Sequence, residues 1–82
     1  MTLFLDFVTP QKRVTSKLEV IHVVVPAVLG EVMILPGHTL FLGALGKGRL
    51  LFKDIQQQEH RYEISGGFVE VREEGKVSIL AE

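Results

Sequence analysis

The side chains that could take part in chemistry are few and scattered along the chain. His22, His38 and His60 share no spacing typical of metal ligands, and the His-x-His pattern of a β-sandwich metal site is absent. Ser65 has no Gly-x-Ser-x-Gly context for a nucleophile, and Gly66-Gly67 has neither the lysine nor the helix of a phosphate-binding loop. An enzyme would require convergent polar groups, and none can be assembled here. We therefore expect no catalytic residue, no metal and no cofactor.

Composition narrows the possible partners. The chain has 82 residues, a net charge of −1 and a pI near 6.3, so nucleic acid is not an expected partner. Cysteine is absent, which excludes disulfides and thiolate metal sites. The longest apolar run, Val23 to Leu29, contains a proline and is far shorter than the roughly 20 residues of a membrane span. The N-terminus has no basic segment before an apolar one, so we expect a cytosolic, soluble domain without membrane insertion.

Short apolar segments separated by turn residues indicate strands rather than helices. No window has apolar residues at i, i+3, i+4 and i+7 over a helical length. The pattern predicts an all-β domain, a sandwich or a barrel, occupying residues 1–82. The expected strands cover residues 3–8, 14–25, 32–35, 39–45, 49–55, 60–65, 68–71 and 76–81.

The segment from Gly30 to His38 is the organising corner of this pattern. Val32 to Leu35 is a continuous apolar run, which predicts a short strand buried on both faces. Pro36-Gly37 then stops the strand and holds His38 at a rigid corner. Upstream, Pro26 is expected to close the preceding strand, and downstream Gly43 is a candidate bulge.

Four motifs, in order, carry a resemblance over essentially the whole chain. They are Val23-Val24-Val25-Pro26 followed by Gly30-Glu31, Ile34 to His38, Leu42 to Gly48, and Ser65-Gly66-Gly67-Phe68-Val69-Glu70-Val71. Together they resemble the N-terminal domain of the epsilon subunit of F-type ATP synthases. The resemblance implies a β-sandwich of two five-stranded sheets, with about ten short strands. Because the chain ends after Leu-Ala-Glu, it is similar to a short form that lacks the family's C-terminal helical hairpin.

The resemblance also implies a function and partners. It implies a non-catalytic rotor subunit of the central stalk that links the gamma subunit to the polar loops of the c-ring and couples ion translocation to ATP synthesis. Such a subunit is peripheral, on the cytoplasmic face of the energy-transducing membrane. The alternative is a small β-sandwich adaptor unrelated to the ATP synthase. A basic cluster at Lys47, Arg49 and Lys53 fits a solvated or rim face, or a contact with phosphate or an acidic partner.

Individual residues receive roles from the same resemblance. It implies a c-ring-facing loop of Val28, Leu29, Gly30 and Glu31, a gamma-facing pair of His38 and Thr39, and structural turns at Pro36, Gly37, Gly66 and Gly67. Glu31 would pair with a basic side chain of the ring, or else is a solvated residue at a strand start. His38 would lie in the gamma interface or bond locally to its turn. Val28 and Leu29 either contact a partner or tuck beneath the sandwich edge.

Overall fold

Alternating apolar residues form eight strands in the computed structural model, which describes residues 2–37 and 40–82. The strands are β1 Leu3–Val8, β2 Arg13–Ala27, β3 Gly30–Ile34, β4 Phe41–Leu45, β5 Gly48–Asp54, β6 Glu59–Ile64, β7 Gly67–Val71 and β8 Lys76–Ala81. Within the described residues the only helical segment is one 3-10 turn, η1 Glu73–Gly75. The all-β class expected from the sequence is confirmed.

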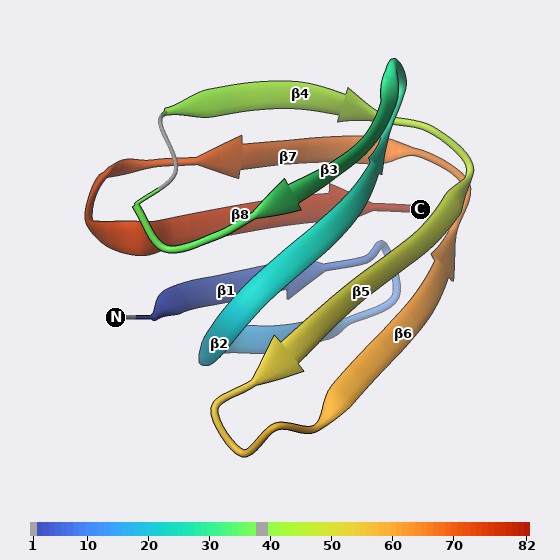
Figure 1. Cartoon of the computed structure of the whole chain (residues 1–82). Helices are drawn as coiled ribbons and strands as arrows, with labels where there is room; N and C mark the ends of the chain where they lie inside the picture. Colours follow the sequence, from blue (N-terminus) through green and yellow to red (C-terminus); the bar gives the residue numbers. More distant parts are fainter. Residues whose placement is uncertain (1, 38–39) are drawn as a thin grey trace.

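The long strand β2 belongs to two layers (Figure 1). Its first part, up to Val20, pairs with β1, which continues into a layer ordered β1-β8-β7-β4. Its second part, from Val20 to Ala27, pairs with β5 and β3, and β6 completes that second layer. All pairs are antiparallel except β1 with β8. The result is one continuous sheet folded over itself as a sandwich.

Among the described residues, sixteen buried apolar side chains form the core between the two layers. Strand alternation supplies them, since successive side chains point to opposite faces. In β1, for example, Leu3, Leu5 and Phe7 are completely buried. The rings of Phe7 and Tyr62 form a T-shaped pair with a centroid distance of 5.2 Å, which ties β1 in one layer to β6 in the other. Each large buried side chain contributes about 1.5–3 kcal/mol to folding.

The strand count differs from the expected number of about ten. The residue pattern itself marks eight segments, and the structure keeps residues 13–27 as a single strand that serves both layers. Counting β2 in each layer gives one layer of five strands and one of four. Pro26 was expected to end this strand. Instead it lies inside β2, opposite Glu31. Proline is tolerated there because its missing N–H is not needed at that position of the ladder.

Two further expectations were wrong. Val32 to Leu35 is not buried on both faces: Ile34 is fully buried, whereas Met33 is 52% exposed. The reason is that a strand of a two-layer sandwich covers the core with one face and turns the other to solvent, and Met33 lies on that outer face. Gly43 is not a bulge, because β4 pairs with β7 without a shift in register. Instead, a Cβ at Gly43 would lie 2.8 Å from the ring of Phe41, so glycine leaves room for that ring.

Candidate protein-interaction site

The turn between β2 and β3 displays apolar side chains at one end of the sandwich. Ala27 pairs with Gly30, which leaves a two-residue loop of Val28 and Leu29. The Val28 side chain is 65% exposed and Leu29 is 100% exposed, so neither tucks beneath the sandwich edge. Gly30 has φ +135°, a value that L side chains rarely adopt. The sequence therefore builds a tight hairpin whose tip is apolar and open to a partner.

Main-chain hydrogen bonds hold this corner against the other layer. The Val28 N–H donates to the Ala44 carbonyl at 3.0 Å, and the Gly46 N–H donates to the Pro26 carbonyl at 2.8 Å. These two bonds join the end of β4 to the end of β2. The exposed tip is consequently displayed on a fixed backbone, and a backbone held in this way loses little freedom when a partner binds.

Glu31 follows the tip as an exposed residue at the start of β3. No ion pair joins its carboxylate to any residue of 2–37 or 40–82. Val28, Leu29, Gly30 and Glu31, the four residues assigned to a ring-facing loop, therefore stand together at the corner. They also line one side of a groove of about 500 Å³ whose other side is Phe41 to Ala44.

The Pro36-Gly37 corner lies at the opposite end of β3. Gly37 has φ +87°, which a turn of this kind requires and which glycine adopts without steric cost. His38 and Thr39, the two residues assigned to a gamma contact, lie outside the described residues, so their assignment stays a prediction. Their described neighbours Gly37 and Leu40 line a hollow together with Thr2.

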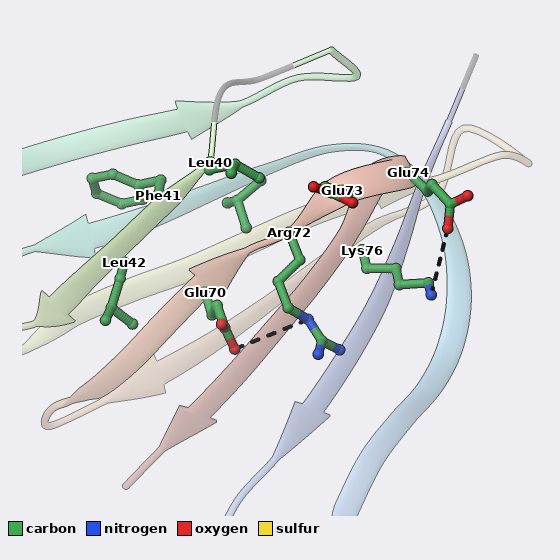
Figure 2. A pocket seen from close by; sticks show the side chains of 9 residues that line it. Leu40, Phe41, Leu42, Glu70, Arg72, Glu73, Glu74 and Lys76 are labelled. Atoms are coloured by element: carbon green, nitrogen blue, oxygen red, sulfur yellow. Dashed lines mark ion pairs between the residues drawn. The ribbon is translucent and has the colours of Figure 1, made fainter.

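Beside this corner a second groove of about 570 Å³ runs between β4 and the turn that follows β7 (Figure 2). Leu40 and Leu42 form one side and are 65% and 74% exposed. Charged side chains form the other side, where Arg72 pairs with Glu70 at 4.0 Å and Lys76 pairs with Glu74 at 3.7 Å. The groove joins an apolar strip to a charged one, the usual make-up of a protein-interaction surface.

The Gly66-Gly67 bend has a structural role. Gly67 has φ +143°, and a Cβ there would lie 2.0 Å from the Leu80 carbonyl oxygen, so only glycine allows β7 to approach β8. The Ser65 N–H donates to the Glu82 carbonyl at 2.7 Å, and the Glu82 N–H donates to the Gly66 carbonyl at 3.0 Å. The bend thus fastens the end of β8 to the start of β7.

Asp54 is the one buried charged residue among those described, and its role is also structural. Its carboxylate lies 3.0 Å from His60 Nε2 and accepts the N–H groups of Gln56 at 2.8 Å and Gln58 at 3.0 Å. The hydrogen bond with His60, followed by those from the backbone, holds the pKa of Asp54 below its usual value. These bonds close the turn between β5 and β6.

Sequence reasoning missed several residues of these surfaces. Met33, Leu40 and Leu42 were assigned to strands without a site role, and Arg72 was not singled out. A signal was present, since alternate residues of a sandwich strand point away from the core, but only the packing of the two layers shows which residues do so. Within the described part of the chain, no group of three acidic, histidine or cysteine side chains could hold a metal ion.

The exposed apolar corner and the two grooves define a β-sandwich of the protein-interaction class. The description of the family whose model matches residues 2–82 is "ATP synthase, Delta/Epsilon chain, beta-sandwich domain", and the chain belongs to this family. It is 46% identical over 80 residues to the ATP synthase epsilon chain of Maridesulfovibrio salexigens, covering 98% of this chain and 54% of that protein. The ATP synthase epsilon chain of Nitratidesulfovibrio vulgaris strain DP4 is 43% identical over 81 residues, covering 99% of this chain and 58% of that protein.

Solved structures have the same fold. A chain in the Euglena gracilis mitochondrial ATP synthase, a structure of OSCP, F1 and the c-ring, superposes with a TM-score of 0.92 at 25% identity and covers 98% of this chain and 50% of its own. A chain in the Tetrahymena thermophila mitochondrial ATP synthase central stalk and c-ring structure superposes with a TM-score of 0.83 at 15% identity. The match covers 99% of this chain and 63% of that one, and it supports the fold alone. The chain thus spans little more than half the length of the curated relatives it matches. No helix among the residues described is long and apolar enough to cross a membrane.

Proposed function

We propose that this chain is a non-catalytic component of the central stalk of a rotary F-type ATP synthase. In this role residues 1–82 form one rigid domain that joins the gamma subunit to the c-ring and so couples ion movement to ATP synthesis. The domain is peripheral, at the cytoplasmic face of the energy-transducing membrane. The observation that carries the proposal is the family match over residues 2–82.

The ring contact is assigned to the corner Val28, Leu29, Gly30 and Glu31. Its support is the complete exposure of Leu29 on a turn that two main-chain hydrogen bonds hold in place. Leu29 supplies apolar area, and the exposed Glu31, with its carboxylate, suits a lysine or arginine of the ring loops. A sandwich with a close-packed core deforms little, so a load on the corner reaches the rest of the domain.

The gamma contact is assigned to His38 and Thr39. Its support is the adjoining groove, where the exposed Leu40 and Leu42 face the ion pairs of Arg72 and Lys76 (Figure 2). Exposed apolar side chains beside charged ones favour a protein partner over solvent. The alternative of an adaptor unrelated to the ATP synthase has no comparable support, given the family match.

Size-exclusion chromatography with light scattering tests this function. The purified chain is mixed with its cognate gamma subunit, and co-elution at a one-to-one mass is the expected result. Glu31→Lys is expected to weaken incorporation of the complex into membranes that carry the c-ring, without unfolding the domain. Glu63→Lys, an exposed change on β6, is the matched control and should incorporate normally. Elution of the chain alone would contradict the proposed function.

A further inference from the structure

The strand β3 leaves one row of its main-chain groups without a partner. It pairs only with β2, where Pro26 lies opposite Glu31. The Pro26 carbonyl accepts the Gly46 N–H and therefore points away from β3. Antiparallel ladders alternate hydrogen-bonded and non-hydrogen-bonded pairs, so Glu31 and Met33 both direct their N–H and C=O groups away from β2. These four groups face outward along the edge of the sandwich.

Nothing in the described structure covers this edge. No hydrogen bond joins the outward groups of Glu31 and Met33 to the main chain of residues 2–37 or 40–82. Proteins normally protect open edges with lysine, proline or a bulge. Here the register from Gly30 to Ile34 is unbroken, the strand contains no lysine or proline, and its single charge is Glu31.

The neighbouring groove adds a second open edge to the same side. Because Ala44 directs its carbonyl to Val28, the alternation along β4 directs the N–H and C=O groups of Leu42 toward this side as well. The groove of about 500 Å³ lies between β3 and β4, which diverge from the corner in Figure 1. Leu42 is 74% exposed, and apart from Glu31 the residues that line the groove are apolar.

We propose that β3 receives an extended segment of the gamma subunit as an added strand. The inference rests on the proposed function, which supplies gamma as the partner. β3 runs from the corner assigned to the ring to the Pro36-Gly37 turn, which directly precedes His38 and Thr39, the pair assigned to gamma, so the edge continues the proposed interface. Main-chain bonds to Glu31 and Met33 would give affinity, and alternate side chains of the donor would enter the groove.

The chemistry of the edge restricts the donor segment. Apart from the carboxylate of Glu31, the side chains of β3 and of the groove are uncharged. A matching segment therefore has apolar residues at alternate positions, no acidic residue, and an N–H and a C=O group opposite each outward residue of β3. A helix cannot satisfy the edge, because its own main-chain groups are already bonded along its axis.

Amide hydrogen exchange of the chain, alone and with gamma, tests the inference at residue resolution. In the free chain the amides of Glu31 and Met33 should exchange rapidly, whereas those of Val32 and Ile34, which face β2, should be protected. In the complex the amides of Glu31 and Met33 should slow by about tenfold or more. A complex that leaves both amides fast would overturn the inference while the proposed function stands. Absence of any complex would refute the proposed function itself.

A pair of proline variants gives an independent test. Met33→Pro removes an outward N–H at β3, and Arg61→Pro removes the corresponding outward N–H at β6, since Met33 and Arg61 end the same cross-strand row. With far-UV circular dichroism showing both folded, Met33→Pro should weaken gamma binding by about tenfold and Arg61→Pro by less than about twofold. Should Met33→Pro not fold, Met33→Lys replaces it in the same assay. Equal affinities, or a gamma-free dimer with Glu31 and Met33 protected, would overturn the inference.

Discussion

The two edges of the second layer, β3 and β6, have the same backbone geometry and opposite side-chain chemistry. A single cross-strand row runs from Met33 through Val24 and Leu51 to Arg61. The hydrogen bond from the Asp54 N–H to the Gln58 carbonyl sets the alternation at β6, so Arg61, like Met33, points its main-chain groups outward. The β3 and β6 edges therefore differ only in the side chains that surround their unpaired main-chain N–H and C=O groups.

Charge surrounds the open groups of β6. Arg61 forms an ion pair with Glu59, and Glu63 pairs with Arg49 on the neighbouring strand at 3.6 Å. A strand added there would have to desolvate these charges, which is costly. Around β3, by contrast, Met33 is 52% exposed and Glu31 is the only charge. The layer thus has one edge protected by charge and one edge suited to a partner, on opposite sides.

The buried sides of the two edges should respond alike, and this gives the largest expected effect. Ile34 on β3 and Ile64 on β6 both lie in the core, with exposures of 0% and 5%. Replacing either by alanine should lower the free energy of unfolding by about 2–4 kcal/mol. Urea denaturation measures both changes. A much smaller loss for Ile34→Ala would mean that β3 is not packed as the structure shows.

The exposed sides should respond differently. Met33→Lys places a charge on the β3 edge and should weaken gamma binding by about tenfold or more, about 1.4 kcal/mol, because the ammonium group must be desolvated. The free energy of unfolding should change by less than about 0.5 kcal/mol, since the side chain is exposed. The matched control is Glu63→Lys on β6. Binding titrations in which the two variants weaken affinity equally would remove the distinction between the edges.

Acid should loosen the β6 side and spare the β3 side. The folded-state pKa of Asp54 is lowered by His60 and two backbone N–H groups, so its stabilising effect is complete above the ordinary carboxyl pKa of about 3.9. That effect is lost as the pH falls through the lowered folded-state pKa. Below about pH 4, exchange of the His60 and Tyr62 amides, which face β5, should accelerate before that of Val32 and Ile34. In Asp54→Asn this extra acid sensitivity should disappear, and its persistence would assign the effect to other groups.

The smallest effect is expected at the surface ion pair itself. Arg61→Ala breaks the pair with Glu59, whose members are exposed, and should change the free energy of unfolding by no more than about 0.5 kcal/mol. Its role is to keep other strands away, so stability alone does not report on it. A loss of more than about 1.5 kcal/mol on thermal or urea unfolding would show that the pair holds β6 in place instead.

The local pattern of apolar and turn residues was sufficient to predict most strand positions. It was insufficient to predict which residues of the edge strands are exposed. Alternation and turn residues placed β1 at the expected residues 3–8 and β8 at 76–81. The exposure of Met33 could not be predicted, because an apolar run is buried on both faces only when other elements pack on both faces of its sheet. The position of Pro26 within β2 likewise depends on which ladder pairs are bonded. Both depend on contacts between distant segments.

The candidate site was predictable only in part. Resemblance assigned Val28 and Leu29 to a partner contact, and the structure shows both exposed at the corner. The assignments of His38 and Thr39 stay predictions. The bond between Asp54 and His60 was missed because it forms only once the β5–β6 turn closes and brings the two side chains together. The outward direction of the β3 main-chain groups could not be predicted, because it depends on strand pairing and not on residue type.

The central claim is that the partner side of this domain is the β3 edge and not the β6 edge. The chain has no cysteine, so Met33→Cys and Arg61→Cys each introduce one unique thiol at the two ends of the same row. The rate of thiol labelling is measured for each variant, free and assembled with gamma and the c-ring. We predict that assembly slows labelling at residue 33 by about tenfold or more and leaves residue 61 within about twofold. Protection at residue 61 with residue 33 still reactive would contradict the account.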